Sequence, residues 1–332
     1  MLYPVLFTPI YKEMVWGGER LHTLYNRFLP YKYTGESWDI SCRPPNGRSS
    51  GLSEMGLVEN GPCAGITFAQ WIECDRPGVL GTRFLLTERF PLLVKIIDAQ
   101  DHLSIQVHPD DVYALAKNES DSGKNEIWYI LEPPDEGYLI IGLQEGVTRE
   151  ILRNALETNE AETCFNRLFV KKGDIVNIPT GLVHALTRGA MVAEIQQNSD
   201  LTYRIYDYNR TGLDGKPRTL HIQDAFNVID FENKIPKQTV TGDAIVHNEH
   251  CVQTQVIKNM YFTVIKYQIN GVINELSDPE KFYIFTSVDG SFNIRSSKIT
   301  VDLPLSRSAF IPAGLGAYEI QGNGILLKCF VT

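Results

Sequence analysis

The strongest constraint on the fold of this chain is a turn motif at residues 173–186, which reads G-D-I-V-N-I-P-T-G-L-V-H-A-L. Pro179 fixes the backbone angle φ and Gly181 permits a positive φ, so we expect the chain to reverse sharply and to enter a β-strand. His184 follows beside the bend, where a neutral imidazole can bind a metal ion. The motif therefore predicts a β-rich fold with a metal ligand next to a tight turn.

The same motif occurs a second time near the C-terminus. Residues 311–317 read I-P-A-G-L-G-A and repeat residues 178–184, I-P-T-G-L-V-H, at an offset of 133 positions. A repeated turn and strand unit indicates a second domain of the same type. The second copy has Ala317 where the first has His184. We therefore expect one metal site per chain, in the first domain.

Partners for His184 lie upstream. Gln106 and His108 are two residues apart in a predicted strand, so their side chains share one face of it. Glu126 stands at the start of another predicted strand. Two imidazoles, a carboxylate and an amide oxygen suit Zn²⁺, and Mn²⁺, Fe²⁺ or Co²⁺ are also chemically admissible. Two alternatives stay open: a surface ion pair of Glu126 with Lys124 instead of metal binding, and a Gln106 that only orients His108 or a water molecule.

Four sequence patterns resemble those of type I mannose-6-phosphate isomerases, which are cupin proteins. The patterns are K-x8-S-x-Q-x-H-P-D from Lys95, K-x-E from Lys124, P-x-G-x2-H from Pro179 and E-I-Q-Q-x-S-D-x-T-Y-R from Glu194. The resemblance also includes residues 15–18 and 35–38, and it extends from about residue 4 to the C-terminus. It is closest to the shorter bacterial form of the family, which lacks a large helical insertion.

This resemblance implies an all-β protein with two cupin (jelly-roll-like) β-barrels and a short helical insertion at about residues 148–166. Residues 1–240 are expected to form the catalytic, metal-binding domain, and residues 241–332 a metal-free domain. The implied activity is the interconversion of mannose 6-phosphate and fructose 6-phosphate through a cis-enediol. The implied cofactor is one zinc ion per chain, with the ligands Gln106, His108, Glu126 and His184.

The resemblance also implies a set of residues around the sugar phosphate. The catalytic candidates are Arg204, Lys124, Glu194 and Lys95. The substrate-binding candidates are Ser104, Lys95 and Arg204. Glu194 and Lys124 are both candidates for the general base, because a proton must move between C2 and C1 of the sugar.

Three of these assignments have structural alternatives. Lys95 lies in an apolar strand, where it can extend to water from a sheet edge instead of pointing into a pocket. Arg204 can form an ion pair with Asp200 or Asp207 instead of binding an anion. Glu194 can orient a neighbouring ligand instead of moving a proton.

Strand patterns dominate the rest of the first domain. The predicted strands are 91–97, 126–131, 138–141, 165–170, 174–178 and 190–197. Residues 148–159 form the clearest predicted helix, with Thr148 as its N-cap and an apolar face made of Ile151, Leu152, Ala155 and Leu156. Residues 109–125 are predicted to form a loop or helical insertion, and residues 219–240 a short helix followed by a linker with Pro236 near its end.

Charge and hydrophobicity exclude some classes of partner. The formal net charge of −9 disfavours nucleic acid and anionic membranes, so local lysines and arginines must meet an anionic sugar phosphate. No apolar run is long enough to span a bilayer, and the N-terminus has no secretory pattern, so we expect a cytoplasmic location. The oligomeric state is not predicted.

Two other functions stay open at this stage. A two-cupin metal dioxygenase is expected to have a third histidine at Gln106, and a general cupin has asparagine where this chain has Arg188. A non-catalytic sugar-binding cupin would tolerate the loss of ligands, whereas the first domain has every ligand that the resemblance implies.

Overall fold

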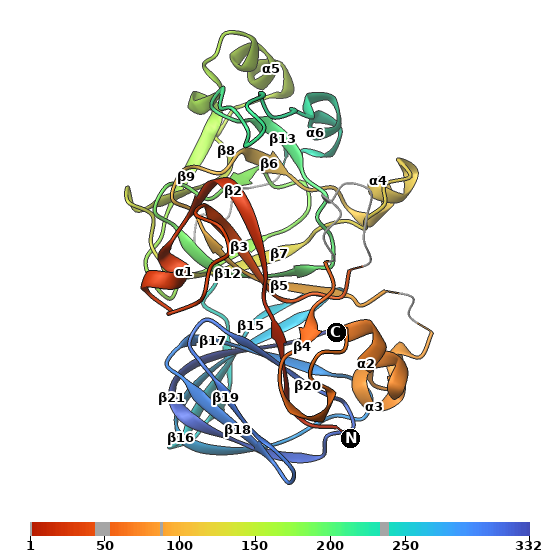
Figure 1. The fold of residues 1–332 in the computed structure, drawn as a ribbon. Helices are drawn as coiled ribbons and strands as arrows, with labels where there is room; N and C mark the ends of the chain where they lie inside the picture. Colours follow the sequence, from red (N-terminus) through yellow and green to blue (C-terminus); the bar gives the residue numbers. More distant parts are fainter. Residues whose placement is uncertain (1, 44–53, 87–88, 233–238) are drawn as a thin grey trace. The chain divides into compact units, whose positions relative to one another are not determined.

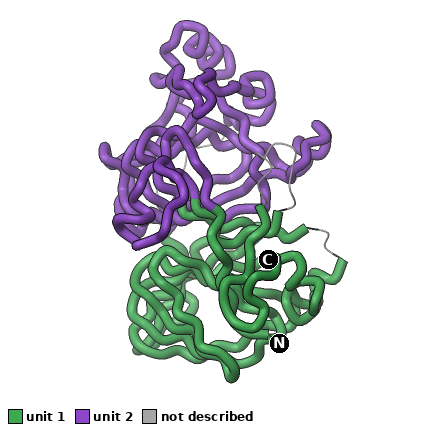
Figure 2. Tube along the Cα trace, viewed as in Figure 1, with its two compact units in different colours: residues 1–10, 37–96, 241–332 green, residues 11–36, 97–240 purple. Residues whose placement is uncertain are grey.

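The structure of this chain is a computed structural model that describes residues 2–43, 54–86, 89–232 and 239–332. The chain divides into two compact units (Figure 2). Unit 1 contains residues 1–10, 37–96 and 241–332, and unit 2 contains residues 11–36 and 97–240. In the first third of the chain, the backbone passes from one unit to the other three times, each time within a strand. These strands are β2 (Ile10–Gly18), β3 (Thr34–Ile40) and β5 (Leu92–Asp98).

Unit 1 is built on one large antiparallel sheet. Its strands are β1 (Val5–Thr8), β4 (Leu57–Val58), β14 (Asp243–His247), β15 (Cys251–Lys258), β16 (Thr263–Leu276), β17 (Tyr283–Asp289), β18 (Phe292–Ser296), β19 (Thr300–Leu303), β20 (Ser308–Ile311) and β21 (Ala317–Phe330). The main path through this sheet is β14-β15-β16-β21-β17-β20-β1-β4, and β18 pairs with β19 and β21. The N-terminal strand β1 thus completes a sheet that is otherwise made mainly of C-terminal strands.

Short helices in unit 1 follow β4. They are η1 (Gly61–Cys63), α2 (Phe68–Cys74), α3 (Arg76–Leu80) and η2 (Thr82–Phe84). Thr67 and Gln70 form a capping box at the start of α2, so side chains satisfy backbone groups that the first turn of a helix leaves unpaired.

Unit 2 contains two groups of strands. One group has the order β10-β7-β12, with β7 (Glu126–Glu132), β10 (Ile175–Ile178) and β12 (Met191–Gln197). The other is a five-stranded sheet with the order β13-β6-β11-β8-β9, made of β6 (Ile105–Val107), β8 (Tyr138–Leu143), β9 (Phe165–Phe169), β11 (His184–Ala185) and β13 (Tyr203–Tyr206). The helices are α1 (Arg20–Thr23), α4 (Asp111–Ala116), α5 (Arg149–Glu157), η3 (Ala161–Cys164) and α6 (Ile222–Val228).

The five-stranded sheet separates two apolar clusters. One face, with Ile105 and Ile140, packs with Leu152 of α5 and Phe226 of α6, and Figure 1 shows both helices beside β8, β6 and β13. The other face packs with side chains of β7, β10 and β12, including Trp128. Strand alternation therefore directs every second side chain of β6, β8 and β11 between the two groups of strands.

The elements predicted in residues 91–197 are confirmed, with ends shifted by one or two residues in most strands. Thr148 caps α5, since its side chain accepts a hydrogen bond from the amide of Ile151. The predicted apolar face of α5 is wrong at Ile151, whose side chain is 48% exposed. The buried residues of this helix are Leu152 and Ala155. Residues 109–125 contain α4, and α6 lies in the predicted segment 219–240, whose Pro236 lies outside the described residues.

The chain is mostly β, as the sequence predicts. In the described residues, no helix has both the length and the apolar character needed to cross a membrane.

The turn before His184 has the predicted conformation. Gly181 has a φ of 83°, its amide donates to the carbonyl of His108 at 3.0 Å, and the amide of Leu182 donates to the carbonyl of Pro179. A Cβ at Gly181 would lie 3.1 Å from the carbonyl oxygen of Val228. The positive φ and this close approach both require glycine.

We expect Gly181→Ala to lower the free energy of unfolding by about 1–3 kcal/mol, because alanine is strained at positive φ. Urea denaturation measures this change. Gly146→Ala is the matched control, since Gly146 also has a positive φ of 85° but has open space around its Cβ position. A Gly181 variant no less stable than the Gly146 variant would contradict the role of the close contact.

Candidate metal and substrate site

The predicted ligands His108, Glu126 and His184 lie together in unit 2. Their ligand atoms all lie within 4.8 Å of one another, and all three side chains are buried. Nε2 of His108 is 3.6 Å from Oε2 of Glu126, and Nε2 of His184 is 3.4 Å from Oε1. His108 follows the end of β6, Glu126 begins β7 and His184 begins β11, so both groups of strands contribute to the cluster.

Backbone carbonyls fix the state of both imidazoles. Nδ1 of His108 is 2.8 Å from the carbonyl oxygen of Leu201, and Nδ1 of His184 is 2.8 Å from that of Leu182. A carbonyl only accepts hydrogen bonds, so each Nδ1 carries the hydrogen. The lone pair of each neutral ring is therefore on Nε2, the atom that faces Glu126. Metal-binding histidines commonly have this arrangement.

Burial favours the neutral form of both histidines. It lowers the pKa of His108 to about 3, with a further contribution from the ammonium of Lys124. Burial also lowers the pKa of His184. Both rings are therefore neutral at neutral pH and can act as nitrogen ligands without first losing a proton.

Glu126 is the charged member of the cluster. Burial alone would raise its pKa, but Lys124 and His108 hold the pKa well below the usual range, so the side chain is a carboxylate. Nζ of Lys124 is 2.6 Å from Oε2, so the two residues form an ion pair, but it is buried and not at the surface as the alternative required. Oε2 of Glu126 is thus ion-paired with Lys124, whereas its Oε1 has no hydrogen-bond partner among the described residues. A divalent cation is a suitable partner for such an oxygen.

Gln106 is next to the cluster. It pairs directly with His184 across β6 and β11, and its Nε2 lies 3.3 Å from Nε2 of His184. In this orientation the amide nitrogen faces the cluster, where it can donate a hydrogen bond to the lone pair of His184. A rotation of the amide about its last side-chain torsion would place Oε1 there instead.

Lys124 and Glu194 lie beside the cluster. Nζ of Lys124 is 3.3 Å from Nε2 of His108 and 3.8 Å from Oε1 of Glu194. Glu194 is directly opposite Trp128 in the β12–β7 pair, and Nε1 of Trp128 donates to Oε2 of Glu194 at 2.8 Å. Trp128 also meets His184 edge to face, at 5.4 Å between ring centres. We did not predict Trp128, although its position two residues after Glu126 indicates the same strand face.

Arg204 is directly opposite Gln106 in the β13–β6 pair. It forms no ion pair with another described residue, and its buried Nε has no acceptor among them. Burial lowers its pKa, and the more distant charges of Asp207 and Asp200 raise it. The ion pair that was the alternative for Arg204 is thus not formed within the described part of the chain.

Arginines are concentrated around Asp207. Arg210 lies 2.6 Å from its Oδ1, and Arg218 lies 3.4 Å from the same atom. Burial, together with the nearby charge of Arg204, lowers the pKa of Arg218 to about 10. Arg210 and Arg218 thus share the buried carboxylate of Asp207, and Arg210 also lies 3.4 Å from Asp101, while Arg204 is near enough to lower the pKa of Arg218. We did not predict Arg218, because its 14-residue separation from Arg204 gives no local signal.

The other two predicted substrate residues are both buried. Ser104 lies directly before β6 in unit 2. Lys95 lies on β5 in unit 1, with Nζ 4.9 Å from the centre of the Trp38 ring, so it is not an exposed lysine at a sheet edge. Its role toward the substrate stays a prediction.

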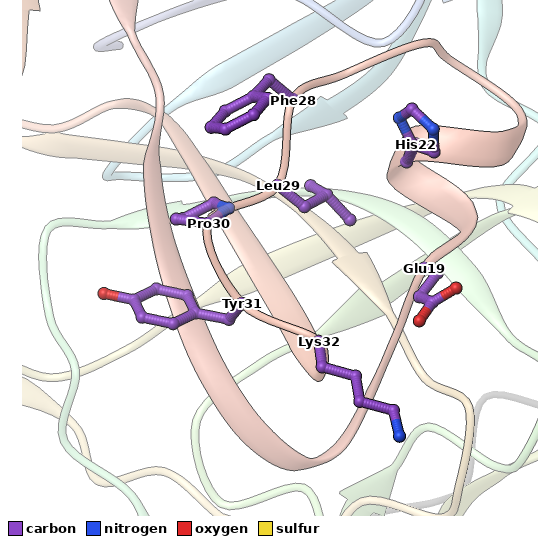
Figure 3. Close-up of a pocket in the computed structure, with 7 residues that line it drawn as sticks. All are labelled: Glu19, His22, Phe28, Leu29, Pro30, Tyr31 and Lys32. Atoms are coloured by element: carbon purple, nitrogen blue, oxygen red, sulfur yellow. The ribbon is translucent and has the colours of Figure 1, made fainter.

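A pocket of about 380 Å³ in unit 2 contains none of the predicted site residues. Figure 3 shows its lining, where Phe28, Leu29, Pro30 and Tyr31 follow one another along a loop and Glu19 and His22 come from the start and middle of the α1 region. Phe28 is largely exposed. This surface pocket is separate from the residues of the metal cluster.

Comparisons with known proteins agree with the geometry. Residues 5–129 match the family described as phosphomannose isomerase type I, catalytic domain, and residues 252–331 match the mannose-6-phosphate isomerase cupin domain. A probable mannose-6-phosphate isomerase of Bacillus subtilis (strain 168) is 36% identical over 97% of this chain and 98% of its own length. Mannose-6-phosphate isomerase ManA of the same organism is 34% identical over 99% of this chain and 98% of its own length. The crystal structure of a Bacillus subtilis mannose 6-phosphate isomerase aligns with a TM-score of 0.87 and 32% identity, over 98% of this chain and 99% of that one.

Proposed function

The chain belongs to the type I mannose-6-phosphate isomerase family, and from this premise we propose that it interconverts mannose 6-phosphate and fructose 6-phosphate at the cluster of His108, Glu126 and His184. One observation carries the location of the site. Two neutral imidazoles direct their lone pairs at a buried carboxylate, in a chain of a family of isomerases. A dioxygenase is not favoured, because the family matches are all to isomerases.

We propose that His108, Glu126, His184 and Gln106 hold one zinc ion per chain. The donor set fits, since the carboxylate of Glu126 is buried, its Oε1 has no hydrogen-bond partner among the described residues, and both Nε2 lone pairs face it. Gln106 would bind through Oε1, after rotation of its amide. When bound, the ion would act as a Lewis acid toward the oxygens at C1 and C2 of the sugar. Measuring metal per chain, and activity after loading with Zn²⁺, Mn²⁺, Fe²⁺ or Co²⁺, tests this assignment.

The residues around the cluster suit proton transfer between C2 and C1. We propose Glu194 as the base, because Trp128 holds one of its oxygens and burial keeps bulk water away. Lys124 would supply positive charge for the developing enediolate, since it is already ion-paired with Glu126. Lys124 is the second candidate for the base. Lys95 and Ser104 complete the proposed substrate residues.

We propose that Arg204 and Arg218 bind the phosphate group. Each guanidinium offers several donors in a fixed plane; Arg218 shares Asp207 with Arg210, and Nε of Arg204 has no acceptor among the described residues, so both arginines have donors left for an anion. The acidic chain as a whole repels a sugar phosphate, so donors from local arginines are needed to bind it.

For Arg218→Ala we expect the KM for mannose 6-phosphate to rise about 10- to 100-fold, as for the loss of a hydrogen bond to a charged group, with a smaller change in kcat. Steady-state kinetics measures both constants. Lys216→Ala is the matched control, since Lys216 is exposed and two residues away. An unchanged KM in the Arg218 variant would exclude it from the phosphate site.

We also propose that each domain contains a cupin-like barrel, with the catalytic domain in residues 1–240 and a metal-free domain in residues 241–332. The cupin-domain match over residues 252–331 and the repeated turn motif support this proposal. In the second domain Ala317 begins β21 at the position that corresponds to His184, so no imidazole is present there.

A further inference from the structure

The backbone that leads into the site is hydrogen-bonded to Gln197, the last residue of β12. Oε1 of Gln197 accepts hydrogen bonds from both the amide and Nδ2 of Asn125, at 2.9 and 2.8 Å. The amide of Gln197 also donates to the carbonyl of Asn125 at 3.0 Å. Asn125 stands between Lys124 and Glu126, so these three bonds fix the chain where it enters the site.

The same glutamine reaches the base of the preceding insertion. Its Nε2 donates to Oδ1 of Asp111 at 3.2 Å, and the amide of Gly123 donates to that oxygen at 2.8 Å. The insertion is closed tightly at this point, because a Cβ at Gly123 would lie 2.5 Å from the backbone of Asp110. The amide of Lys124 donates to the carbonyl of Pro109 at 3.1 Å. Asp111, Gln197 and Asn125 therefore form one hydrogen-bonded clamp.

Lys124 depends on this clamp more than Glu126 does. Glu126 is part of β7 and is paired on both sides, with Ile178 of β10 and Gln196 of β12. Lys124 precedes the strand and has no place in either ladder. Its ammonium is nevertheless buried and close to His108, Glu126 and Glu194. The clamp is what fixes the backbone from which that side chain extends.

We propose that Gln197 is a positioning residue for the isomerisation, which acts by holding Lys124 in the site through Asn125. This inference rests on the proposed role of Lys124. Within the described residues, the side chain of Gln197 hydrogen-bonds to Asn125 and Asp111, so it acts on the reaction through the clamp and not by touching the sugar. The position requires an amide: it must accept two hydrogen bonds on one atom and donate toward a carboxylate with the other.

Gln197→Glu tests the proposal. Glutamate keeps the acceptor for Asn125 but places a second carboxylate against Asp111, so the clamp should open. We expect kcat to fall about 10- to 100-fold, as for a catalytic group displaced by roughly 1 Å, with KM and metal content near the wild-type values. Asp111→Asn alone should have little effect, because its oxygen can still accept both bonds. The double variant Gln197→Glu/Asp111→Asn should recover only part of the lost kcat, because the repulsion between two carboxylates is gone but a single asparagine atom cannot both accept from the Gly123 amide and donate to the introduced glutamate.

A second series separates positioning from loss of stability. In a Lys124→Ala background, Gln197→Glu should cause no further loss of kcat/KM, since its effect passes through Lys124. An additional loss as large as in the wild-type background would overturn the proposal, as would wild-type kcat in Gln197→Glu. If Gln197→Glu does not fold, Asn125→Ala takes its place in the Lys124→Ala series; it removes the bond from Nδ2 to Gln197 and the bond from the Thr180 amide to Oδ1, and it leaves the backbone bonds of the clamp. Wild-type turnover of Lys124→Ala itself would instead reject the proposed role of Lys124, and the inference with it.

Discussion

Replacing His184 with alanine is expected to remove the bound metal and to lower kcat/KM by about 1,000-fold or more, because a metal ion supplies several kcal/mol of transition-state stabilisation. His184 is fully buried, and its Nε2 faces Oε1 of Glu126 at 3.4 Å. Alanine at this position leaves the other three proposed ligands, Gln106, His108 and Glu126, but no imidazole on β11. The backbone pairs of β11 with β6 and β8 do not involve the side chain, so the fold should be retained.

Metal per chain after dialysis, measured by elemental analysis, is the decisive readout for this variant. Near-ultraviolet circular dichroism shows whether the tertiary structure is intact. His250→Ala serves as the matched control, because His250 is exposed and lies in unit 1. The control should keep the metal and full activity. A folded His184→Ala protein with stoichiometric, tightly bound metal would remove His184 from the set of ligands.

Arg204→Ala is expected to keep its metal and to lose about 100- to 1,000-fold in kcat, the usual cost of removing a donor that stabilises developing negative charge. The guanidinium is largely buried, forms no ion pair in the described part of the chain, and lies opposite the ligand candidate Gln106. A buried cation without a carboxylate partner is costly unless it serves a bound anion.

Steady-state kinetics with measured metal content separates this role from a structural one. Arg188→Ala is a suitable control, since its side chain is 67% exposed and pairs with Asp135 at the surface. The control should retain wild-type kinetics. A metal-loaded Arg204→Ala enzyme with near-normal kcat/KM would show that the arginine has only a structural role.

The parts of the site set by local rules were predictable from the sequence. The two-residue period places Gln106 and His108 together, and proline and glycine chemistry fixes the turn before His184. The start of β7 at Glu126 follows from its β-branched and aromatic residues. Local patterns failed at Ile151, where helical periodicity defines a face only to within about one residue.

Contacts that depend on distant pairing were not predictable. Trp128 donates to Glu194, 66 positions away, only because β7 and β12 are neighbours in register. The three arginines around Asp207 and the clamp of Gln197 on Asn125 arise in the same way. The strand β1 pairs Val5 with Phe310, so early residues join the unit of the C-terminal strands. The hydrophobic periodicity within one strand does not show which distant strand pairs with it, or in which register.

The most direct test of this account is conversion of mannose 6-phosphate by the purified protein, followed as fructose 6-phosphate in a coupled assay before chelation, after chelation and after return of zinc. We predict activity that disappears as the metal is removed and returns with stoichiometric zinc. Activity that persists after complete and verified removal of the metal would contradict the metal site. The absence of activity in the fully zinc-loaded protein would contradict the proposed reaction itself.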